Sequence, residues 1–378
     1  MDTLECYRLE IDEIDKQMTS LFEKRMNLSK KICEYKIKKN MPVYQKDRED
    51  KVIKKNISYL KDKDYELFLK NYYTNIMYLS RLIQNKIINK KEFKFKDIVP
   101  KVKYENYRIG YQGVSGSFSE EAMNIYFKET ISSKHYSNFE DLFIALKGNE
   151  IDYAIIPVEN SSTGGISKVY DLLNKYDFYI VGEECIKINQ NLVGIKGSEI
   201  EDIKEVYSHP QGFEQSSEFF TQYNKLKLIP YSNTAISAKL VSELNDKSKA
   251  AIASDKAAKI YNLDIIKENI NDIEDNYTKF AIIGKDLELN SNCNKSSMIF
   301  SIEHEVGSLY NILGYFARHN INLTKIESRP IKNTPWKYLF YVDIEGNIND
   351  SNVIDSIEIV KEECEYFKFL GSYPKCKI

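Results

Sequence analysis

The chain has 378 residues, which allows two or three domains of ordinary size. Its 54 Lys and Arg residues nearly balance its 56 Asp and Glu residues, and the net charge of −2 argues against a nucleic-acid-coating protein or a polyanionic tail. Hydrophobic residues make up 42% of the chain and no apolar run approaches the ~18 residues of a membrane span, so we expect folded cores and no transmembrane segment.

The basic residues are nearly all lysine, and only seven are arginine. A guanidinium grips a carboxylate with two parallel donors, which lysine cannot copy, so each arginine in such a chain is a candidate site residue. The seven are Arg8, Arg25, Arg48, Arg81, Arg108, Arg318 and Arg329.

The cysteines are scattered and form no CxxC pair, and the four histidines form no cluster with metal-ligand spacing. The first residues, MDTLECYRLEID, contain no apolar signal core. We therefore expect a cytoplasmic protein without a metal site, whose thiols are reduced and inert. The six cysteines are Cys6, Cys33, Cys185, Cys293, Cys364 and Cys376.

Residues 1–92 are predicted to be all-helical. Apolar residues recur every three or four positions from Leu4 to Tyr35, which predicts one helix to about Asn40, ended by Pro42. At 1.5 Å per residue this helix is roughly 55 Å long. An apolar seam of that length needs a partner of similar length, and a dimer is the simplest solution. A second helix follows Asp47, and a third covers about residues 65–88.

Charged residues interrupt this seam. Arg8 and Arg25 stand where apolar residues belong, and Lys36 lies three turns after Arg25 on the same face. One interpretation is an interhelical salt bridge or snorkelling at the seam edge, and the other is an anion pocket between helices. Polar residues on the next two helices that would complete such a pocket are Arg48, Glu49, Ser80 and Gln84.

Residues 89–105 are expected to form a charged linker, after which an α/β region runs from about Arg108 to Gly284. Hydroxyl and amide loops follow several predicted strands, which indicates a carboxylate-binding cleft, although each loop alone could be a turn or helix cap. Neither GxGxxG nor a P-loop is present, which argues against a nucleotide site. For His209, a structural imidazole and a cleft residue remain equal alternatives. The loops are residues 113–117 (GVSGS), 159–165 (ENSSTGG), 208–211 (SHPQ) and 233–235 (NTA).

Residues 1–92 resemble the all-helical chorismate mutases, which are intertwined helical dimers. The resemblance implies that Lys36 and Gln84 are catalytic and donate to the breaking ether oxygen. It also implies that Arg8 binds substrate in the partner subunit's site. Further substrate-binding residues implied by the resemblance are Arg25, Arg48, Glu49 and Ser80. Gln45 is a departure, because relatives of this architecture often carry Asp there.

Residues 106–285 resemble prephenate dehydratase, whose α/β fold has two lobes like those of periplasmic binding proteins. The match lies in the loops above and in Asn276-Tyr277-Thr278-Lys279-Phe280. The resemblance implies that Thr278 assists the leaving hydroxyl. Residues expected to line the pocket are Asn160, Ser161, Ser208, Gln211, Thr234 and Phe280. Lys279 stands where the family has Arg, which would weaken a two-pronged grip on a substrate carboxylate.

Residues 296–376 are predicted to fold as βαββαβ, an α+β ferredoxin-like module, and resemble the ACT domain, a small-molecule sensor. Two motifs carry the resemblance, Gly307-Ser308-Leu309 and Glu327-Ser328-Arg329-Pro330. They imply an allosteric phenylalanine site between paired subunits. Alternatively, Arg329 only ties down a strand end.

We therefore expect a multidomain bifunctional enzyme that converts chorismate to prephenate and prephenate to phenylpyruvate, and that phenylalanine inhibits. It would need no cofactor, bind neither nucleic acid nor membrane, and form a homodimer or higher homo-oligomer. One rival is a phenylalanine-sensing regulatory protein with one or both catalytic domains inactive. A second is a transport-type binding protein, which the absent signal peptide disfavours.

Overall fold

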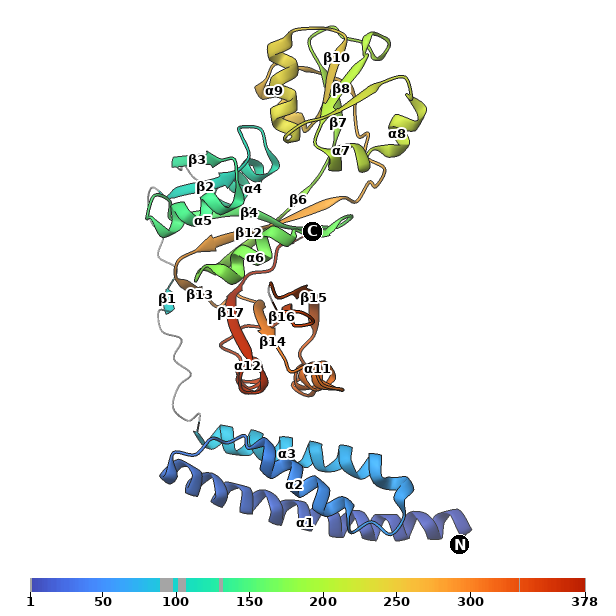
Figure 1. The fold of residues 1–378 in the computed structure, drawn as a ribbon, viewed down its shortest axis with the longest axis vertical. Coiled ribbons are helices and arrows are strands. Elements are labelled where there is room, and N and C mark those ends of the chain that lie inside the picture. The colour runs from blue at the N-terminus through green and yellow to red at the C-terminus, as the bar shows by residue number, and fades with distance from the viewer. Residues whose placement is uncertain (1, 89–97, 101–106, 129–131, 333, 378) are drawn as a thin grey trace. The chain divides into compact units, whose positions relative to one another are not determined.

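The computed structural model describes residues 2–88, 98–100, 107–128, 132–332 and 334–377 (Figure 1). The chain divides into two compact units, one made of Met1–Phe95 with Ile354–Glu362 and the other of Lys96–Val353 with Glu363–Ile378. Within the described ranges, no helix combines the length and the apolar character that crossing a membrane requires.

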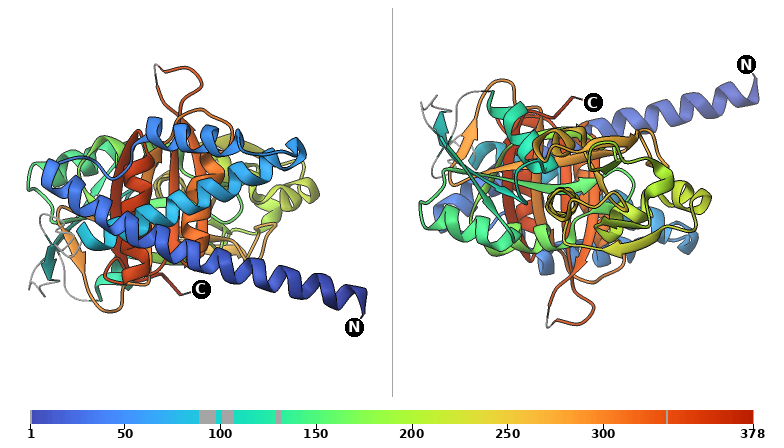
Figure 2. Two further views of the ribbon diagram at one scale, coloured as in Figure 1. Left: turned by 90° about the horizontal axis from the view of Figure 1, so that it is seen from below. Right: turned by 90° about the horizontal axis from the view of Figure 1, so that it is seen from above.

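The N-terminal residues form helices, as predicted. The elements are α1 (Thr3–Lys39), α2 (Lys46–Ile57), a 3-10 turn (Lys63–Tyr65) and α3 (Glu66–Ile88). Helix α1 ends at Asn40, whose left-handed φ of 52° lets its N–H reach the carbonyl oxygens of Lys36 and Ile37. The predicted single helix to about Asn40 is therefore confirmed, and both views of Figure 2 show α1 extending as one rod to the N-terminus.

Helix α1 buries a different face from the predicted seam. Its buried residues are Met26, Ser29, Cys33 and Lys36, on the side that packs against α3. The seam residues are instead between 43% and 64% exposed in the single chain: Leu4, Ile11, Ile14, Met18, Leu21, Leu28, Ile32 and Tyr35. A long apolar stripe is thus left without a partner inside the chain.

The α/β region has two lobes, each with its own sheet. In the first lobe the strand order is β3-β2-β4-β12-β6, and β5 pairs with β4. The strands are β2 (Arg108–Gln112), β3 (Ser132–Tyr136), β4 (Tyr153–Asn160), β5 (Gly164–Gly165), β6 (Tyr179–Lys187) and β12 (Tyr277–Gly284). The helices of this lobe are α4 (Phe118–Phe127), α5 (Phe139–Lys147) and α6 (Ser167–Lys175). Helices α5 and α6 pack on this sheet with a buried core that includes Leu142, Phe143 and Ile156.

The second lobe has a sheet in the order β11-β7-β10-β8-β9. Its strands are β7 (Asn191–Gly194), β8 (Glu205–Ser208), β9 (Lys227–Pro230), β10 (Lys249–Ala253) and β11 (Asp264–Lys267). Its helices are η2 (Ile200–Asp202), α7 (Pro210–Glu214), α8 (Ser217–Gln222), α9 (Thr234–Leu244) and α10 (Asp255–Ile260). The chain passes between the lobes twice, from β6 to β7 and from β11 to β12, which is the two-lobed plan that the sequence predicts (Figure 1).

The C-terminal module (residues 296–376) has the predicted βαββαβ order. Its elements are β14 (Lys295–Ser301), α11 (Ser308–Arg318), β15 (Leu323–Pro330), β16 (Tyr338–Glu345), α12 (Ser351–Glu363) and β17 (Tyr366–Tyr373). The strands form a sheet in the order β15-β16-β14-β17. Tyr341 and Leu370 of this sheet share one buried core with Ile156, Ile180 and Ala281 of the first lobe, so the module and that lobe pack as one body.

The predicted linker is not wholly irregular. Ile98–Pro100 forms strand β1, which pairs in parallel with β13 (Leu287–Leu289), while residues 89–97 and 101–105 of the linker lie outside the described residues. The high charge of the segment hid this strand, because IVP alone is too short to show a periodic pattern.

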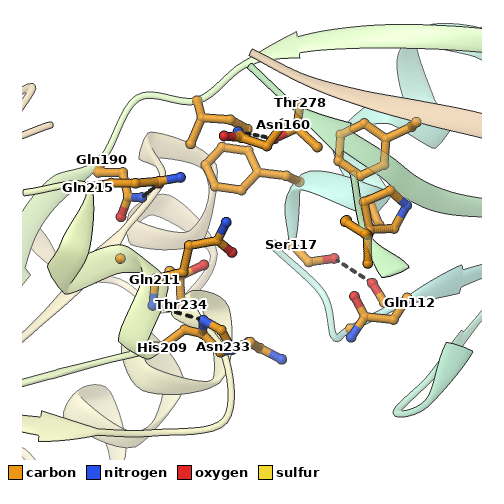
Figure 3. Close-up of a pocket in the computed structure, with 18 of the residues that line it drawn as sticks. Gln112, Ser117, Asn160, Gln190, His209, Gln211, Gln215, Asn233, Thr234 and Thr278 are labelled. Atoms are coloured by element: carbon orange, nitrogen blue, oxygen red, sulfur yellow. Dashed lines mark hydrogen bonds between the residues drawn. The ribbon is translucent and has the colours of Figure 1, made fainter. Parts of the chain in front are cut away.

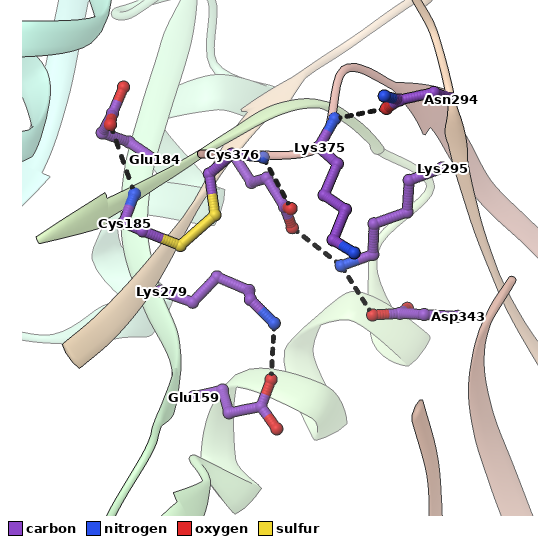
Figure 4. Close-up of a disulfide and its surroundings, with 10 residues drawn as sticks. Glu159, Glu184, Cys185, Lys279, Asn294, Lys295, Asp343, Lys375 and Cys376 are labelled. Carbon is purple, nitrogen blue, oxygen red and sulfur yellow. Dashed lines mark hydrogen bonds and ion pairs between the residues drawn. A yellow bond between two sulfur atoms is a disulfide. The ribbon is translucent and has the colours of Figure 1, made fainter. Parts of the chain in front are cut away.

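Two thiols are not reduced, contrary to expectation. Cys185 on β6 and Cys376 in the C-terminal tail form a disulfide, with Cα atoms 5.8 Å apart and a sequence separation of 191 (Figure 4). Sequence spacing could not reveal the pair because only the packing of the module on the first lobe brings it together. Among the described residues, the free cysteines are Cys6, Cys33, Cys293 and Cys364.

Candidate active sites

The first candidate site is a cavity of about 280 Å³ among α1, α2 and α3, called the helical cavity below. Six of the seven residues predicted for an anion pocket line it: Arg25, Lys36, Arg48, Glu49, Ser80 and Gln84. The seventh, Arg8, is exposed near the start of α1, about three helical turns before Met18. The packing of three helices therefore gathers side chains that lie up to 59 residues apart, counted from Arg25 to Gln84.

Two of the cations are held by hydrogen bonds. Arg25 Nη1 donates to Ser80 Oγ at 2.5 Å and to the carbonyl oxygen of Ile76 at 3.3 Å. Lys36 Nζ donates to the carbonyl oxygen of Val43 at 2.5 Å, so the loop after α1 positions the ammonium. Burial lowers the pKa of both groups, because removal from water disfavours their charged forms. An anion that enters the cavity would therefore stabilise the charged forms of both Arg25 and Lys36.

Gln84 and Glu49 complete the polar lining. The amide of Gln84 is buried, and its Oε1 has no hydrogen-bond partner within the described structure. Glu49 Oε2 accepts a 2.5 Å bond from Arg81 Nη1, and Arg81 also lines the cavity. The scarcity of arginine marked Arg81 as a candidate, but neither the seam pattern nor the family resemblance placed it in this pocket. Gln45, the departure noted above, lies in the lining as well.

The second candidate site is a cavity of about 360 Å³ between the two lobes, called the interlobe cavity (Figure 3). Five of the seven residues predicted for this pocket line it: Asn160, Gln211, Thr234, Thr278 and Phe280. Asn160 and Thr278 are paired across β4 and β12, and Asn160 Nδ2 donates to Thr278 Oγ1 at 2.9 Å. The same Nδ2 also reaches Asn276 Oδ1 at 2.7 Å, so the amide orients the threonine hydroxyl from a fixed position.

Among the described residues, the lining of the interlobe cavity contains no Asp, Glu, Lys or Arg. Instead, the N-termini of α4 and α9 border it, with Ser117 and Asn233 as their N-caps. Amide donors of a first helical turn together with the helix dipole stabilise an anion without a cationic side chain. The cavity is therefore suited to an anionic group such as a carboxylate.

A glycine turn places α4 at this cavity. Gly116 has a left-handed φ of 86°, and a Cβ there would lie 3.1 Å from the Cα of Ala257. Glu120 fixes the turn, because its carboxylate accepts from the N–H of Gly116 at 2.9 Å and from Ser115 Oγ at 3.1 Å. The loop predicted from GVSGS is thus a helix-positioning turn that touches a second-lobe helix.

Family models match three consecutive segments of the chain. They are chorismate mutase type II over residues 7–85, prephenate dehydratase over residues 109–288 and the ACT domain over residues 296–362. A bifunctional chorismate mutase/prephenate dehydratase of Buchnera aphidicola is 32% identical over 100% of this chain and 98% of its own. One of Aquifex aeolicus is 31% identical over 99% of each chain.

The chain belongs to the bifunctional chorismate mutase/prephenate dehydratase family. The solved structure of the Arthrobacter aurescens prephenate dehydratase in complex with L-Phe matches with a TM-score of 0.65 and 27% identity, covering 71% of this chain and 90% of that one. The two-lobed region and the C-terminal module therefore have the architecture of the dehydratase and ACT parts of this family.

Two residues predicted to line the dehydratase pocket lie elsewhere. Ser161 Oγ accepts from the N–H of Tyr277 at 2.9 Å and donates to the carbonyl oxygen of Asp275, so it ties β4 to the segment before β12. Ser208 is fully buried under Gly212, where a Cβ would lie 2.4 Å from its Oγ. Both residues support the cavity wall, and neither borders the cavity.

Other polar residues also line the interlobe cavity, of which Ser117 and Asn233 belong to the predicted GVSGS and NTA loops and the other three had not been predicted. They are Gln112, Ser117, Gln190, Gln215 and Asn233. Gln190 Nε2 donates to Gln215 Oε1 at 2.6 Å. His209 also borders the cavity, and its Nδ1 accepts from the N–H of Gln211 as the N-cap of α7. For His209 the two alternatives therefore coexist in one residue. For Gln112, Gln190 and Gln215 the sequence held no signal, because each is a single amide outside the predicted loops.

Lys279 does not border the interlobe cavity. Side chains alternate along β12, so Thr278 and Phe280 face the cavity while Lys279 faces the C-terminal module. Its Nζ pairs with Glu159 Oε2 at 2.9 Å. Lysine at this position therefore takes part in an ion pair between β12 and β4 of the first lobe and makes no contact with the cavity.

The two predicted sensor motifs occupy different surroundings. Gly307 caps α11 with a left-handed φ of 88°, and no atom of the described residues lies within 4 Å of where its Cβ would be. Ser308 and Leu309 open the helix behind it. In the second motif, Ser328 and Pro330 are exposed on β15. Glu327 and Arg329 lie on the other face of that strand.

That other face contacts the dehydratase lobe. Arg329 donates to Ser167 Oγ at 2.5 Å and pairs with Asp171 Oδ1 at 3.5 Å on α6. Glu327 Oε2 forms an ion pair with Lys325 Nζ at 3.4 Å, and the Glu327 carboxylate lies against Gly165. Arg329 therefore does tie its strand down, and it does so by holding the module to the lobe that carries Asn160.

Proposed function

We propose that the two cavities of this bifunctional enzyme act in sequence, the helical cavity on chorismate and the interlobe cavity on the prephenate that results. The observation that supports this assignment best is the convergence of six dispersed polar residues of three helices in the helical cavity. The paired Thr278 and Asn160 at the interlobe cavity support the second step.

In the helical cavity the reaction is a unimolecular rearrangement that requires no nucleophile. The site has to hold a dicarboxylate in a compact conformer and stabilise charge on the breaking ether oxygen. We assign carboxylate binding to Arg25 and Arg48, with Arg8 supplied by a second copy of the chain. The buried cation of Lys36 and the amide of Gln84 donate to the ether oxygen. Glu49 accepts from the substrate hydroxyl, and Ser80 positions Arg25.

In the interlobe cavity the ring hydroxyl and the carboxylate of prephenate depart together. The electron pair of the breaking carbon–carbon bond enters the ring, carbon dioxide leaves, and the hydroxyl leaves as water once it gains a proton. Thr278 hydrogen-bonds to the leaving hydroxyl, oriented by Asn160. The first turns of α4 and α9 bind the carboxylates, while Gln211, Thr234 and Phe280 shape the pocket around the ring. Ser161 and Ser208 do not contact the substrate but support the wall of the interlobe cavity.

We further propose that the chain works as a homodimer or a higher homo-oligomer. The exposed seam of α1 spans from Leu4 to Tyr35, and a second copy of the same helix buries it most simply. That arrangement would also bring Arg8 to the helical cavity of the other copy. Phenylalanine would bind at the C-terminal module near Gly307–Leu309 and lower the dehydratase activity. The proposed domains are residues 1–92, 106–285 and 296–376, in a cytoplasmic protein.

One assay tests these assignments together. The full chain is incubated with chorismate, and prephenate and phenylpyruvate are followed with and without phenylalanine. We expect both products, with phenylpyruvate reduced by phenylalanine. Arg25→Ala should block the first step and Thr278→Ala should stall the second. Binding of phenylalanine without either product would overturn the enzymatic assignment in favour of a regulatory protein.

A further inference from the structure

Arg81 occupies the wall of the helical cavity beside the proposed substrate residues. Its side chain is 7% exposed, its Nη1 lies 2.5 Å from Glu49 Oε2, and its guanidinium lies 5.0 Å from the centre of the Tyr44 ring. Tyr44 precedes α2, Glu49 is on α2 and Arg81 is on α3. One guanidinium therefore holds two neighbouring elements of the cavity wall.

This contact decides how Glu49 is presented. The bond from Arg81 engages one carboxylate oxygen, Oε2, so a substrate hydroxyl would approach the other. We propose that Arg81 is a positioning residue of the mutase site that fixes the rotamer of Glu49 for substrate binding. The inference rests on the proposed role of Glu49. A buried ion pair that only stabilises the fold is the competing explanation.

A double-mutant cycle separates the two explanations. Arg81→Met, Arg81→Lys, Glu49→Gln and the Arg81→Met/Glu49→Gln double variant are compared in the full chain for kcat and KM with chorismate. Dehydratase activity with added prephenate reports folding, and Lys51→Met, on the exposed face of α2, is the matched control.

If Arg81 acts through Glu49, Arg81→Met lowers kcat/KM by about 10²-fold, as a misplaced reactive group does. Arg81→Lys recovers part of the loss, and the double variant is no worse than Glu49→Gln alone. Losses that simply multiply, or an Arg81→Met enzyme within about twofold of the wild type, would overturn the proposal. Wild-type enzyme without mutase activity would instead refute the proposed function.

A second, independent observation concerns the disulfide. Cys185 is the cross-strand partner of Lys279, the residue after Thr278, and on the other side of β12 Lys279 pairs with Glu159 (Figure 4). Glu159 in turn pairs with Lys325 of β15 at 3.1 Å. The disulfide therefore joins the C-terminal tail to the sheet that carries Thr278, beside an ion-pair chain leading to the second sensor motif.

The tail is held at the same place by a buried charge cluster. The N–H of Cys376 donates to Glu183 Oε1 at 2.9 Å, and Glu183 Oε2 lies 2.8 Å from Lys295 Nζ. Lys295 also pairs with Asp343 at 2.8 Å. Both half-cystines are only half-buried, so a small thiol reagent can reach them. We infer that Cys185 and Cys376 form a redox-controlled latch that fixes the C-terminal module on the dehydratase lobe.

The latch closes by exchange with a low-molecular-weight disulfide such as glutathione disulfide. The Cys376 thiolate attacks one sulfur and releases a glutathione thiolate, after which the Cys185 thiolate attacks Cys376 Sγ and releases the second. The two cysteines lose two electrons and two protons, and the glutathione disulfide becomes two thiols. Closing the latch opposes any shift of the module that phenylalanine induces. This inference rests on the phenylalanine regulation proposed above.

The test equilibrates the full chain in reduced and oxidised glutathione buffers and measures dehydratase inhibition by phenylalanine. We expect the oxidised enzyme to need about fivefold more phenylalanine for half inhibition, a modest coupling energy, with mutase activity unchanged. Peptide mass analysis should find Cys185 linked to Cys376. Cys376→Ser and Cys185→Ser should each abolish the redox effect, whereas Cys6→Ser, an exposed cysteine of the helical unit, should keep it.

Inhibition curves that coincide in the two buffers, or the absence of the linked peptide from the oxidised sample, would overturn the latch. A reduced enzyme that phenylalanine does not inhibit would refute the proposed regulation instead.

Discussion

The hydroxyl of Thr278 can be removed with almost no change in shape. Thr278→Val replaces the hydroxyl by a methyl group at a β-strand position where a branched residue is favourable. The change removes the bond that Asn160 Nδ2 makes to Oγ1 at 2.9 Å. The same Nδ2 keeps Asn276 Oδ1 at 2.7 Å and the carbonyl oxygen of Tyr277 at 3.2 Å.

The expected cost in stability is therefore small. Losing one hydrogen bond while the donor keeps other partners costs about 1 kcal/mol, against a typical stability of roughly 5–15 kcal/mol. The catalytic cost should be larger, because the hydroxyl acts on the group that leaves. Removal of one donor to a developing charge lowers the rate by about 10²–10³-fold, or roughly 2.7–4 kcal/mol.

The assay supplies chorismate and follows both products in one cuvette. Thr278→Val should accumulate prephenate at the wild-type rate while phenylpyruvate falls by the factor above, so the mutase reaction reports folded enzyme. Thr278→Ser should restore most of the dehydratase rate. A Thr278→Val enzyme whose dehydratase kcat/KM stays within about threefold of the wild type would refute the assignment, because such a change is far below the expected 10².

Three further predictions concern other parts of the chain. Burial lowers the pKa of Lys36, and only its protonated form donates a hydrogen bond, so mutase kcat/KM should fall as the pH rises through a value below 10.5. Lys36→Arg should shift this fall in the pH profile to higher pH. Leu21→Asp on the exposed seam should convert dimers to monomers in sedimentation velocity and lower mutase activity, whereas Lys16→Asp outside the seam should not. Lys295→Met should lower the free energy of unfolding by about 3–5 kcal/mol, because the buried Glu183 and the half-buried Asp343 would lose their cation, against about 0–1 kcal/mol for Lys337→Met at an exposed pair.

The sequence predicted the helices and the three folds well because their signals are local. The seam of α1 repeats every three or four residues over its whole length, and Pro42 marks its end. The βαββαβ order of the C-terminal module likewise follows from alternating periods along the chain. The dimer predicted to cover this seam remains a proposal, since within the single chain α1 packs through an adjacent face that includes Met26 and Cys33.

The site residues were harder to predict because a loop motif does not say which of its side chains faces inward. In SHPQ, Gln211 borders the interlobe cavity while Ser208 is buried beneath it. In the strand that contains Thr278, alternation sends Lys279 to the module. Arg81 and the Cys185–Cys376 pair depend on packing between distant segments, for which one sequence has no periodic signal.

The two cavities differ in the charge of the side chains that they offer to a doubly charged substrate. The described lining of the helical cavity contains Arg25, Lys36, Arg48 and Arg81 against Glu49 alone, whereas that of the interlobe cavity contains none of these residue types. Dissolved salt screens attraction between separated charges over about 8–10 Å at ordinary ionic strength, but it acts little on short bonds to neutral donors. Added sodium chloride should therefore slow the capture of chorismate more than that of prephenate. In concentrated salt the same polypeptide would become limited by its first reaction.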